Sequence, residues 1–190
     1  MRYVSDRHTL ARETLEDGDV ALELGVFRGD FTEVLLEYAG KVIAIDSWSH
    51  PIPIMRNDGR WSMEIGTYNE VACRFHGEIK SERLEIITGT SPDVLGTIPD
   101  KSVDWVYIDA SHDYQSVLND LEAVLPKTRK WICGHDYCWC NDYGVVRAVA
   151  VFCDRHGLKI DVLTNEPKSP VGCSTETVAY NSYAIRVPAG

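Results

Sequence analysis

The sequence has no cluster of basic residues. Its 19 lysines and arginines are scattered among 29 acidic residues, so the formal net charge is −10. Nonspecific binding to nucleic acid requires grouped Lys and Arg side chains that neutralise phosphates, so a nucleic-acid partner is disfavoured. The chain also lacks any apolar run near the ~20 residues that cross a membrane, and residues 1–8 have no apolar signal core. We therefore expect no membrane partner and a cytoplasmic protein.

The cysteines are not spaced as a zinc site or as the disulfide framework of a small secreted protein. In a reducing compartment we expect all six to remain thiols: Cys73, Cys133, Cys138, Cys140, Cys153 and Cys173. Cys138 and Cys140 lie close to His135, but one C-x-C beside a single histidine lacks the paired C-x-x-C spacing of zinc sites. We expect residues 138–140 to line a substrate pocket or to pack.

The most informative stretch that is present is a strand followed by a glycine turn. Residues 20–24 have the pattern of a short buried strand, and Gly25 and Gly29 open a turn before a helical pattern that begins at Phe31. Glycine lets the main chain lie against a ligand, and the helix N-terminus offers unpaired N–H groups. The pattern indicates a ligand-binding turn, with an ordinary strand-to-helix turn as the alternative.

A second apolar strand, residues 42–46, ends in Asp46. This carboxylate comes about twenty residues after the turn, where nucleotide-binding folds place an acid on ribose hydroxyls. Phe27 stands where the second glycine of a dinucleotide G-x-G-x-x-G turn would lie, which leaves little room for a pyrophosphate. An oxidoreductase with a dinucleotide cofactor is therefore disfavoured.

The length of 190 residues suits a single domain over 1–190. Helical patterns cover 6–16, 31–40, 68–80, 114–125 and 144–156. Strand patterns cover 20–24, 42–46, 84–87, 103–109, 131–134, 158–163 and 177–187. This alternation predicts a layered α/β sheet. Residues 47–66 form an irregular insertion, which we expect to be a lid, with Trp48, His50 and Trp61 closing over a ligand, or a contact of a homodimer. The alternative is a solvated insertion.

Titratable side chains gather after the fourth and fifth predicted strands. Asp109 ends one strand, with His112 about one turn further on, and His135 and Asp136 follow the next. Parallel strands present their C-terminal ends at one edge, so these groups should lie near the glycine turn. An ordinary histidine pKa of about 6.5 would suit His112 as a proton acceptor. As alternatives, His112 bonds the backbone at a helix start, Asp113 only caps that helix, and His135 is a structural partner of Asp136.

The motifs Glu23-x-Gly25-x-x-x-Gly29, Asp109-Ala-Ser-His112-Asp-Tyr and Gly134-His-Asp-Tyr137 resemble those of class I S-adenosylmethionine (SAM)-dependent methyltransferases. The resemblance covers nearly the whole chain. It is to the small single-domain family, of the methyltransferase family 24 type, related to the macrocin-type sugar O-methyltransferases. It implies a Rossmann-like fold, with helices on both faces of a mostly parallel seven-stranded sheet whose last β segment is antiparallel.

The resemblance implies SAM as the cofactor, with the turn around its amino-acid end. The implied cofactor contacts are Glu23, Gly25, Phe27, Gly29, Asp46, Ser47, Trp48, Thr90, Ser91, Asp109, Ala110 and His112. Asp109 and His112 would be catalytic, with His112 as the base. Asp109 and Asp136, with His135 as a further ligand, would hold a divalent cation such as Mg²⁺. His135 replaces the first Asp of the relatives' Asp-Asp pair, which removes an oxygen ligand that Mg²⁺ favours.

The function implied by the resemblance is O-methylation of a small-molecule acceptor, for example a sugar or a glycosylated metabolite. Two alternatives remain open at this point. One is a noncatalytic domain that binds SAM or a nucleotide, and the other is the disfavoured nucleotide-cofactor oxidoreductase.

Overall fold

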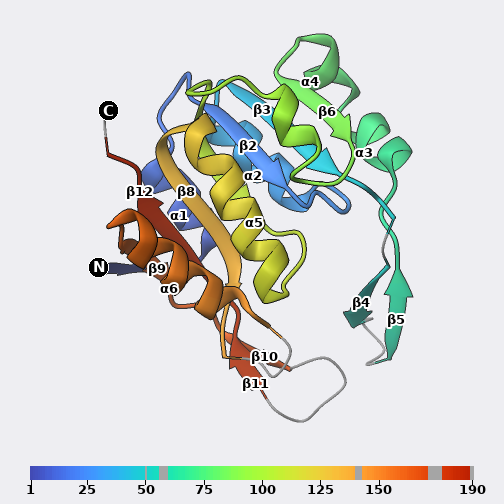
Figure 1. The fold of residues 1–190 in the computed structure, drawn as a ribbon. Coiled ribbons are helices and arrows are strands. Elements are labelled where there is room, and N and C mark those ends of the chain that lie inside the picture. The colour runs from blue at the N-terminus through green and yellow to red at the C-terminus, as the bar shows by residue number, and fades with distance from the viewer. Residues whose placement is uncertain (50, 56–59, 140–142, 171–176, 189–190) are drawn as a thin grey trace.

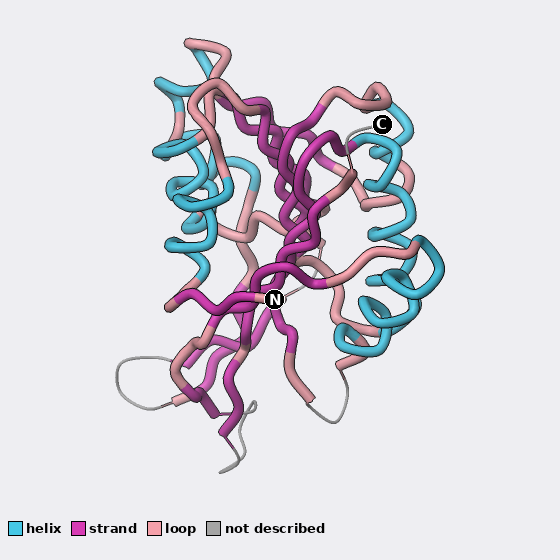
Figure 2. Tube along the Cα trace, turned by 90° about the vertical axis from the view of Figure 1, so that its left-hand side faces the viewer, coloured by secondary structure: helices cyan, strands magenta, loops and turns pink. Residues whose placement is uncertain are grey.

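The computed structural model describes residues 1–49, 51–55, 60–139, 143–170 and 177–188. Its centre is an eight-stranded sheet in the order β1-β9-β12-β8-β7-β2-β3-β6. Of these strands only β12 runs antiparallel to its neighbours. Figure 2 shows the sheet between two layers of helices. The strands are β1 (Arg2–Val4), β2 (Val20–Leu24), β3 (Lys41–Asp46), β6 (Leu84–Thr88), β7 (Val103–Ile108), β8 (Thr128–Tyr137), β9 (Ile160–Thr164) and β12 (Asn181–Arg186).

The helices cover both faces of this sheet (Figures 1 and 2). Side chains from α1 (Arg7–Thr14), α2 (Asp30–Tyr38) and α3 (Tyr68–Arg74) belong to the hydrophobic cluster on one face. Side chains from α5 (Tyr114–Val124) and α6 (Val145–His156) belong to the cluster on the other. A short α4 (His76–Lys80) follows α3, and 3-10 turns lie at Val94–Thr97 and Leu125–Lys127.

The double covering explains the apolar sequence of the central strands. Every residue of β7 is buried: Trp105 and Tyr107 belong to one cluster, and Val106 and Ile108 to the other. Parallel strands with helices on both faces read as continuous apolar runs for this reason. The α1 layer is fixed to the strand by the indole of Trp105, which donates a hydrogen bond to Thr14 Oγ1 at 2.9 Å.

The layered, mostly parallel α/β sheet with an antiparallel last strand confirms the predicted fold class, while the strand count of seven was wrong. The eighth strand is β1, which pairs in parallel with β9 at the sheet edge. Three residues are too few to give a periodic pattern, so the sequence carried no signal for it. The single strand expected over 177–187 is two, β11 (Thr177–Ala179) and β12, and the helix expected over 68–80 is divided at Phe75.

The insertion at 47–66 contains a two-stranded antiparallel hairpin, β4 (Ile52–Met55) and β5 (Trp61–Glu64). A second hairpin, β10 (Lys168–Pro170) with β11, projects in the same general direction as the first in Figure 1. His50, one of the three residues expected to close over a ligand, lies outside the described residues. The lid and dimer roles of this insertion remain predictions.

Cys138 is disulfide-bonded, so the expectation of free thiols was wrong for this residue. Cys73, Cys133 and Cys153 are free, as expected. Cys140 and Cys173 lie outside the described residues. A disulfide depends on two Cβ atoms coming within about 4 Å, which sequence spacing does not reveal. None of the helices in the described ranges has the length and apolar composition that a membrane crossing requires.

Candidate active site

The turn after β2 is built by close backbone approach. Gly25 has a φ of 89°, and its N–H donates to Ile45 O at 2.9 Å. A Cβ at this position would lie 1.9 Å from the carbonyl oxygen of Asp109. Glycine is required because it tolerates positive φ and leaves room for the end of β7. Gly29, with a φ of 83°, precedes the first turn of α2.

The Asp46 carboxylate fastens this turn. Its Oδ2 accepts from the backbone N–H groups of Val26 and Phe27, both at 2.8 Å, and its Oδ1 accepts from Trp48 N at 2.6 Å. Phe27 and Trp48 have positive φ values of 52° and 45°. These backbone bonds hold both residues in a conformation that a non-glycine residue rarely adopts. The predicted ribose contact of Asp46 is not tested by this geometry and stays a prediction.

A cavity of about 580 Å³ opens at the C-terminal edge of the sheet. This is the size range of small-molecule sites. Its lining includes every predicted cofactor residue except Gly29: Glu23, Gly25, Phe27, Asp46, Ser47, Trp48, Thr90, Ser91, Asp109, Ala110 and His112. Gly29 acts instead at the start of α2, where a Cβ would meet the Phe75 ring at 2.5 Å.

Several lining residues come from helices and escaped the sequence prediction. Arg7 reaches the cavity from α1, and Ser116, Asn119 and Asp120 reach it from α5. Asp120 is buried and accepts a hydrogen bond from Ser91 Oγ at 2.5 Å, and burial raises its pKa to about 6. No local sequence signal marked Arg7, because only the packing of α1 brings it to the cavity.

Glu23 lies in the wall of the cavity as a buried acid. Its carboxyl accepts a hydrogen bond from Thr32 Oγ1 at 2.5 Å, and only 1% of the residue is exposed. Burial raises the pKa of Glu23 to about 8, because the charged form loses its hydration. At neutral pH this side chain is mainly protonated, so it can donate a hydrogen bond as well as accept one.

Replacing Glu23 by Gln should remove a pH dependence of stability. Between the ordinary pKa of 4.5 and the folded value of about 8, the folded protein keeps a proton that the unfolded chain releases. Stability therefore falls as pH rises through this window, by about 1.4 kcal/mol for each increase of one pH unit. We expect Glu23→Gln to be more stable than wild type by on the order of 5 kcal/mol at pH 9 and equal to it near pH 4.5. Urea unfolding at both pH values measures this, and an equal difference at both would contradict it.

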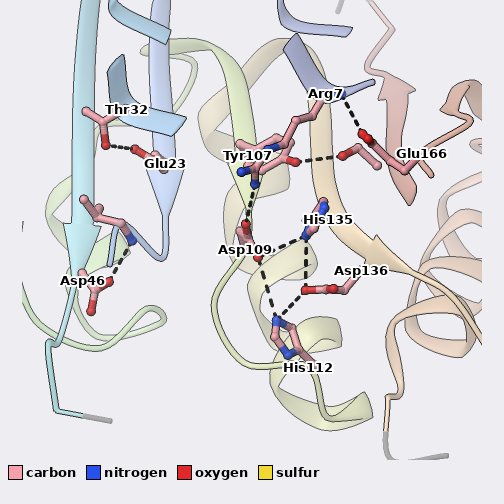
Figure 3. Close-up of polar contacts among 12 residues, drawn as sticks. Arg7, Glu23, Thr32, Asp46, Tyr107, Asp109, His112, His135, Asp136 and Glu166 are labelled. Carbon is pink, nitrogen blue, oxygen red and sulfur yellow. Dashed lines mark hydrogen bonds and ion pairs between the residues drawn. The ribbon is translucent and has the colours of Figure 1, made fainter. Parts of the chain in front are cut away.

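Four titratable side chains converge at the edge of the cavity, at the ends of β7 and β8 (Figure 3). His112 Nε2 lies 2.8 Å from Asp136 Oδ2 and 3.9 Å from Asp109 Oδ1. His135 Nδ1 lies 3.4 Å from Asp136 Oδ2 and 3.7 Å from Asp109 Oδ1. The sequence correctly predicted that these residues meet at one sheet edge. The expected end of the fifth strand at 134 was wrong, since β8 extends to Tyr137 and carries His135 and Asp136 within it.

The two carboxylates shift the pKa values of both histidines. Burial alone would lower the pKa of His112, but Asp109 and Asp136 outweigh it and raise that pKa to about 10. The same balance of burial against Asp109 and Asp136 raises the pKa of His135. Burial would raise the pKa of Asp136, yet contacts with the histidines hold it below its ordinary value. The expectation of an ordinary pKa for His112 was wrong, because sequence spacing does not reveal two acids facing one imidazole.

His112 Nε2 is buried and, among the described residues, has no aligned hydrogen-bond partner. Its 2.8 Å contact with Asp136 is an ion pair by distance but lies outside hydrogen-bond geometry. Ligand atoms of Asp109, His112 and Asp136 all lie within 4.8 Å of one another, a grouping able to hold a metal ion. His135, the predicted third ligand, lies outside that grouping. Asp113 caps α5 by accepting from Gln115 N and Ser116 N, as its alternative interpretation expected.

The comparisons with known proteins agree with this architecture. A family model described as a methyltransferase domain matches residues 22–137, more than half of the chain. No curated protein gives a significant match. The structure is similar to a putative rRNA methylase from Clostridium thermocellum, with a TM-score of 0.64 and 10% identity over 98% of this chain and 99% of that one.

Two further solved structures show the same likeness. A putative methyltransferase from Streptococcus mutans in complex with S-adenosylhomocysteine (SAH) has a TM-score of 0.59 and 9% identity, over 95% of this chain and 96% of that one. The precorrin-6y C5,15-methyltransferase from Geobacter metallireducens has a TM-score of 0.60 and 13% identity, over 95% and 85%. At such identities the likeness establishes the fold alone, which is Rossmann-like.

Proposed function

The chain belongs to the methyltransferase domain family, and from that premise we propose that it transfers the methyl group of SAM to a hydroxyl group of a small molecule. The observation that carries the proposal is the continuity of the site. One cavity joins the glycine turn to Asp109 and His112, which also belong to the carboxylate–histidine cluster. A donor bound along the turn would therefore present its reactive end to that cluster.

The cavity offers a different chemistry at each end. The backbone turn at Gly25 and the fixed Asp46 suit the amino-acid and ribose portions of SAM. Thr90 and Ser91, which follow the C-terminal end of β6, lie on the far side of Asp46 and suit the adenine. This order along one sheet edge follows the general rule that open α/β sheets bind ligands beyond the carboxyl ends of their strands. The SAH in the Streptococcus structure supports the same class of ligand here.

The chemistry asked of the protein is alignment and removal of one proton. The sulfonium of SAM already makes the methyl carbon electrophilic, so the acceptor oxygen must be placed in line with it and must lose its proton. The carboxylate of Asp109 lies where it can take up that proton, and His112, whose raised pKa of about 10 keeps it protonated at neutral pH, would orient the acceptor oxygen by donating a hydrogen bond to it. The ring of Tyr143 packs beside His112, with centroids 4.6 Å apart, and would form one wall around the acceptor. The absence of a basic cluster in the sequence favours a small acceptor over nucleic acid.

The residues present also fit a divalent cation. The buried Nε2 of His112 has no aligned partner among the described residues, and Asp109 and Asp136 supply carboxylate oxygens beside it. These three side chains would hold the ion. Bound there, a divalent cation would lower the pKa of an acceptor hydroxyl and orient it. Because an imidazole joins the two carboxylates, the donor set suits Mn²⁺ or Fe²⁺ better than Mg²⁺, which prefers oxygen ligands alone.

Calorimetric titration of SAM and SAH, with and without Mg²⁺ or Mn²⁺, tests the cofactor. We expect micromolar binding to the wild-type protein and loss of at least a hundredfold in affinity for Asp46→Ala, because two backbone N–H groups of the turn, and that of Trp48, lose their acceptor. Asp154→Ala, an exposed carboxylate on α6, is the matched control and should bind as wild type does. Absence of SAM and SAH binding to the wild-type protein would overturn the proposed function.

A further inference from the structure

We propose that Arg7 recognises the carboxylate of the amino-acid end of SAM and thereby makes the site selective for the complete cofactor. This inference rests on the proposed function. It concerns a residue of α1, outside the glycine turn, that the sequence motifs do not include. The observation behind the proposal is the position of the Arg7 guanidinium. It lies beside Asp109, in the wall of the cavity that the glycine turn also lines.

Arg7 is fixed in place by its surroundings. Its backbone N–H donates to Glu166 Oε1 at 2.8 Å, and its guanidinium lies over the Phe31 ring, 5.0 Å from the centroid. Figure 3 shows the side chain extending from α1 toward Asp109. About a third of the side chain, 31%, is exposed, and it lines the same cavity as Gly25 and Asp109. The charge is therefore positioned before a ligand arrives and remains accessible to one.

The distribution of charge in the cavity gives Arg7 its role. The acidic lining residues are Glu23, Asp30, Asp46, Asp109 and Asp120. Among the lining residues that the structure describes, Arg7 is the only lysine or arginine. The amino-acid end of SAM carries an ammonium and a carboxylate. The ammonium has several acids to approach. The carboxylate is attracted by the two cations of the lining, Arg7 and the protonated His112, but His112 already faces two carboxylates, those of Asp109 and Asp136, so Arg7 is the better partner.

The contact with Asp109 does not occupy all of the N–H donors of the Arg7 guanidinium. The contact joins Arg7 Nη1 to Asp109 Oδ2 at 3.5 Å, which is long for a charge-assisted hydrogen bond. A guanidinium has five N–H donors in a planar fork that matches the two oxygens of a carboxylate. A ligand carboxylate can therefore bind Arg7 while Asp109 remains close to it.

The test compares two ligands that differ in the amino-acid end. SAH contains it, and 5′-methylthioadenosine has the adenosine and thioether without it. Both are titrated calorimetrically into the wild-type protein, Arg7→Ala and Arg7→Gln, with Arg12→Ala as the control from the exposed face of the same helix. We expect both Arg7 variants to bind SAH about 10- to 100-fold more weakly and 5′-methylthioadenosine within about twofold of wild type. Arg12→Ala should change neither affinity.

The outcomes separate this inference from the proposed function. Equal weakening of both ligands would make Arg7 a structural support of the cavity and overturn the inference, as would unchanged SAH binding. In either case SAH still binds the wild-type protein, and the proposed function stands. A wild-type protein that binds neither ligand overturns both. Arg7→Gln keeps much of the length and packing of the side chain over Phe31, so the comparison holds even if Arg7→Ala fails to fold.

Discussion

Gly25→Ala is expected to abolish measurable SAH binding and to destabilise the protein. The added Cβ would lie 1.9 Å from Asp109 O and 2.9 Å from Ala110 N, both backbone atoms that move only with the end of β7. The φ of 89° adds strain on the order of 1–3 kcal/mol for a residue with a side chain. To make room for the Cβ, the turn at Gly25 and the end of β7 at Asp109 must move apart. Both segments line the cavity, so its shape changes. We expect affinity to fall by more than a hundredfold, measured by calorimetry, with a lower midpoint of thermal unfolding.

Gly77→Ala is the matched control for this substitution. Gly77 lies in α4, where a Cβ would meet nothing within 4 Å, and alanine is the better helix former. We expect unchanged SAH binding and equal or slightly higher thermal stability. If Gly25→Ala bound SAH as the wild-type protein does, the close approach between the turn and β7 would not be the basis of the site.

Asp136→Asn and His112→Ala are expected to lower kcat by on the order of 10²–10⁴ while SAH affinity changes much less. The protonated His112, held by Asp136, orients the acceptor for proton removal, a step that contributes about this much to catalysis. Asp136 is 6% exposed and does not line the cavity, so its loss should affect the acceptor side and leave the cofactor side intact. SAH formation with a small-molecule hydroxyl acceptor that the wild-type protein methylates measures kcat, and calorimetry measures affinity.

A second histidine–acid pair provides the control for these variants. His156 Nε2 lies 2.8 Å from Glu122 Oε2 on the surface of α5 and α6, the same separation as between His112 and Asp136. His156→Ala should keep the wild-type kcat. If Asp136→Asn and His112→Ala also retained full turnover, the cluster would be structural and the base would have to be sought elsewhere.

The parts of the site that the sequence predicted are those that follow from strand order. Gly25, Asp46 and Asp109 each end a strand or follow one directly, and parallel neighbouring strands present these positions at one edge. Local patterns were sufficient for them, because an apolar run followed by glycine or an acid marks both the strand and its C-terminal end.

The parts that the sequence did not predict depend on contacts between distant segments. Arg7 reaches the cavity because α1 packs across the sheet, and Asp120 because α5 lies along the cavity. The raised pKa of His112 results from two acids that belong to different segments of the chain. Propensity and periodicity describe one element at a time, so they contain no information on which side chains of separate elements will meet.

The position of β12 has a consequence for the order in which this site can form during synthesis. β12 lies between β8 and β9, and it pairs Tyr183 with Gly134 and Asn181 with Tyr137, on either side of His135 and Asp136. A Cβ on Gly134 would lie 2.5 Å from the Tyr183 hydroxyl, so this pair fits closely. The glycine turn and β7 leave the ribosome well before β12 does. A growing chain can thus assemble the glycine turn and the end of β7 early, while the part of the site that carries His135 and Asp136 waits for β12, a strand that lies much further along the chain.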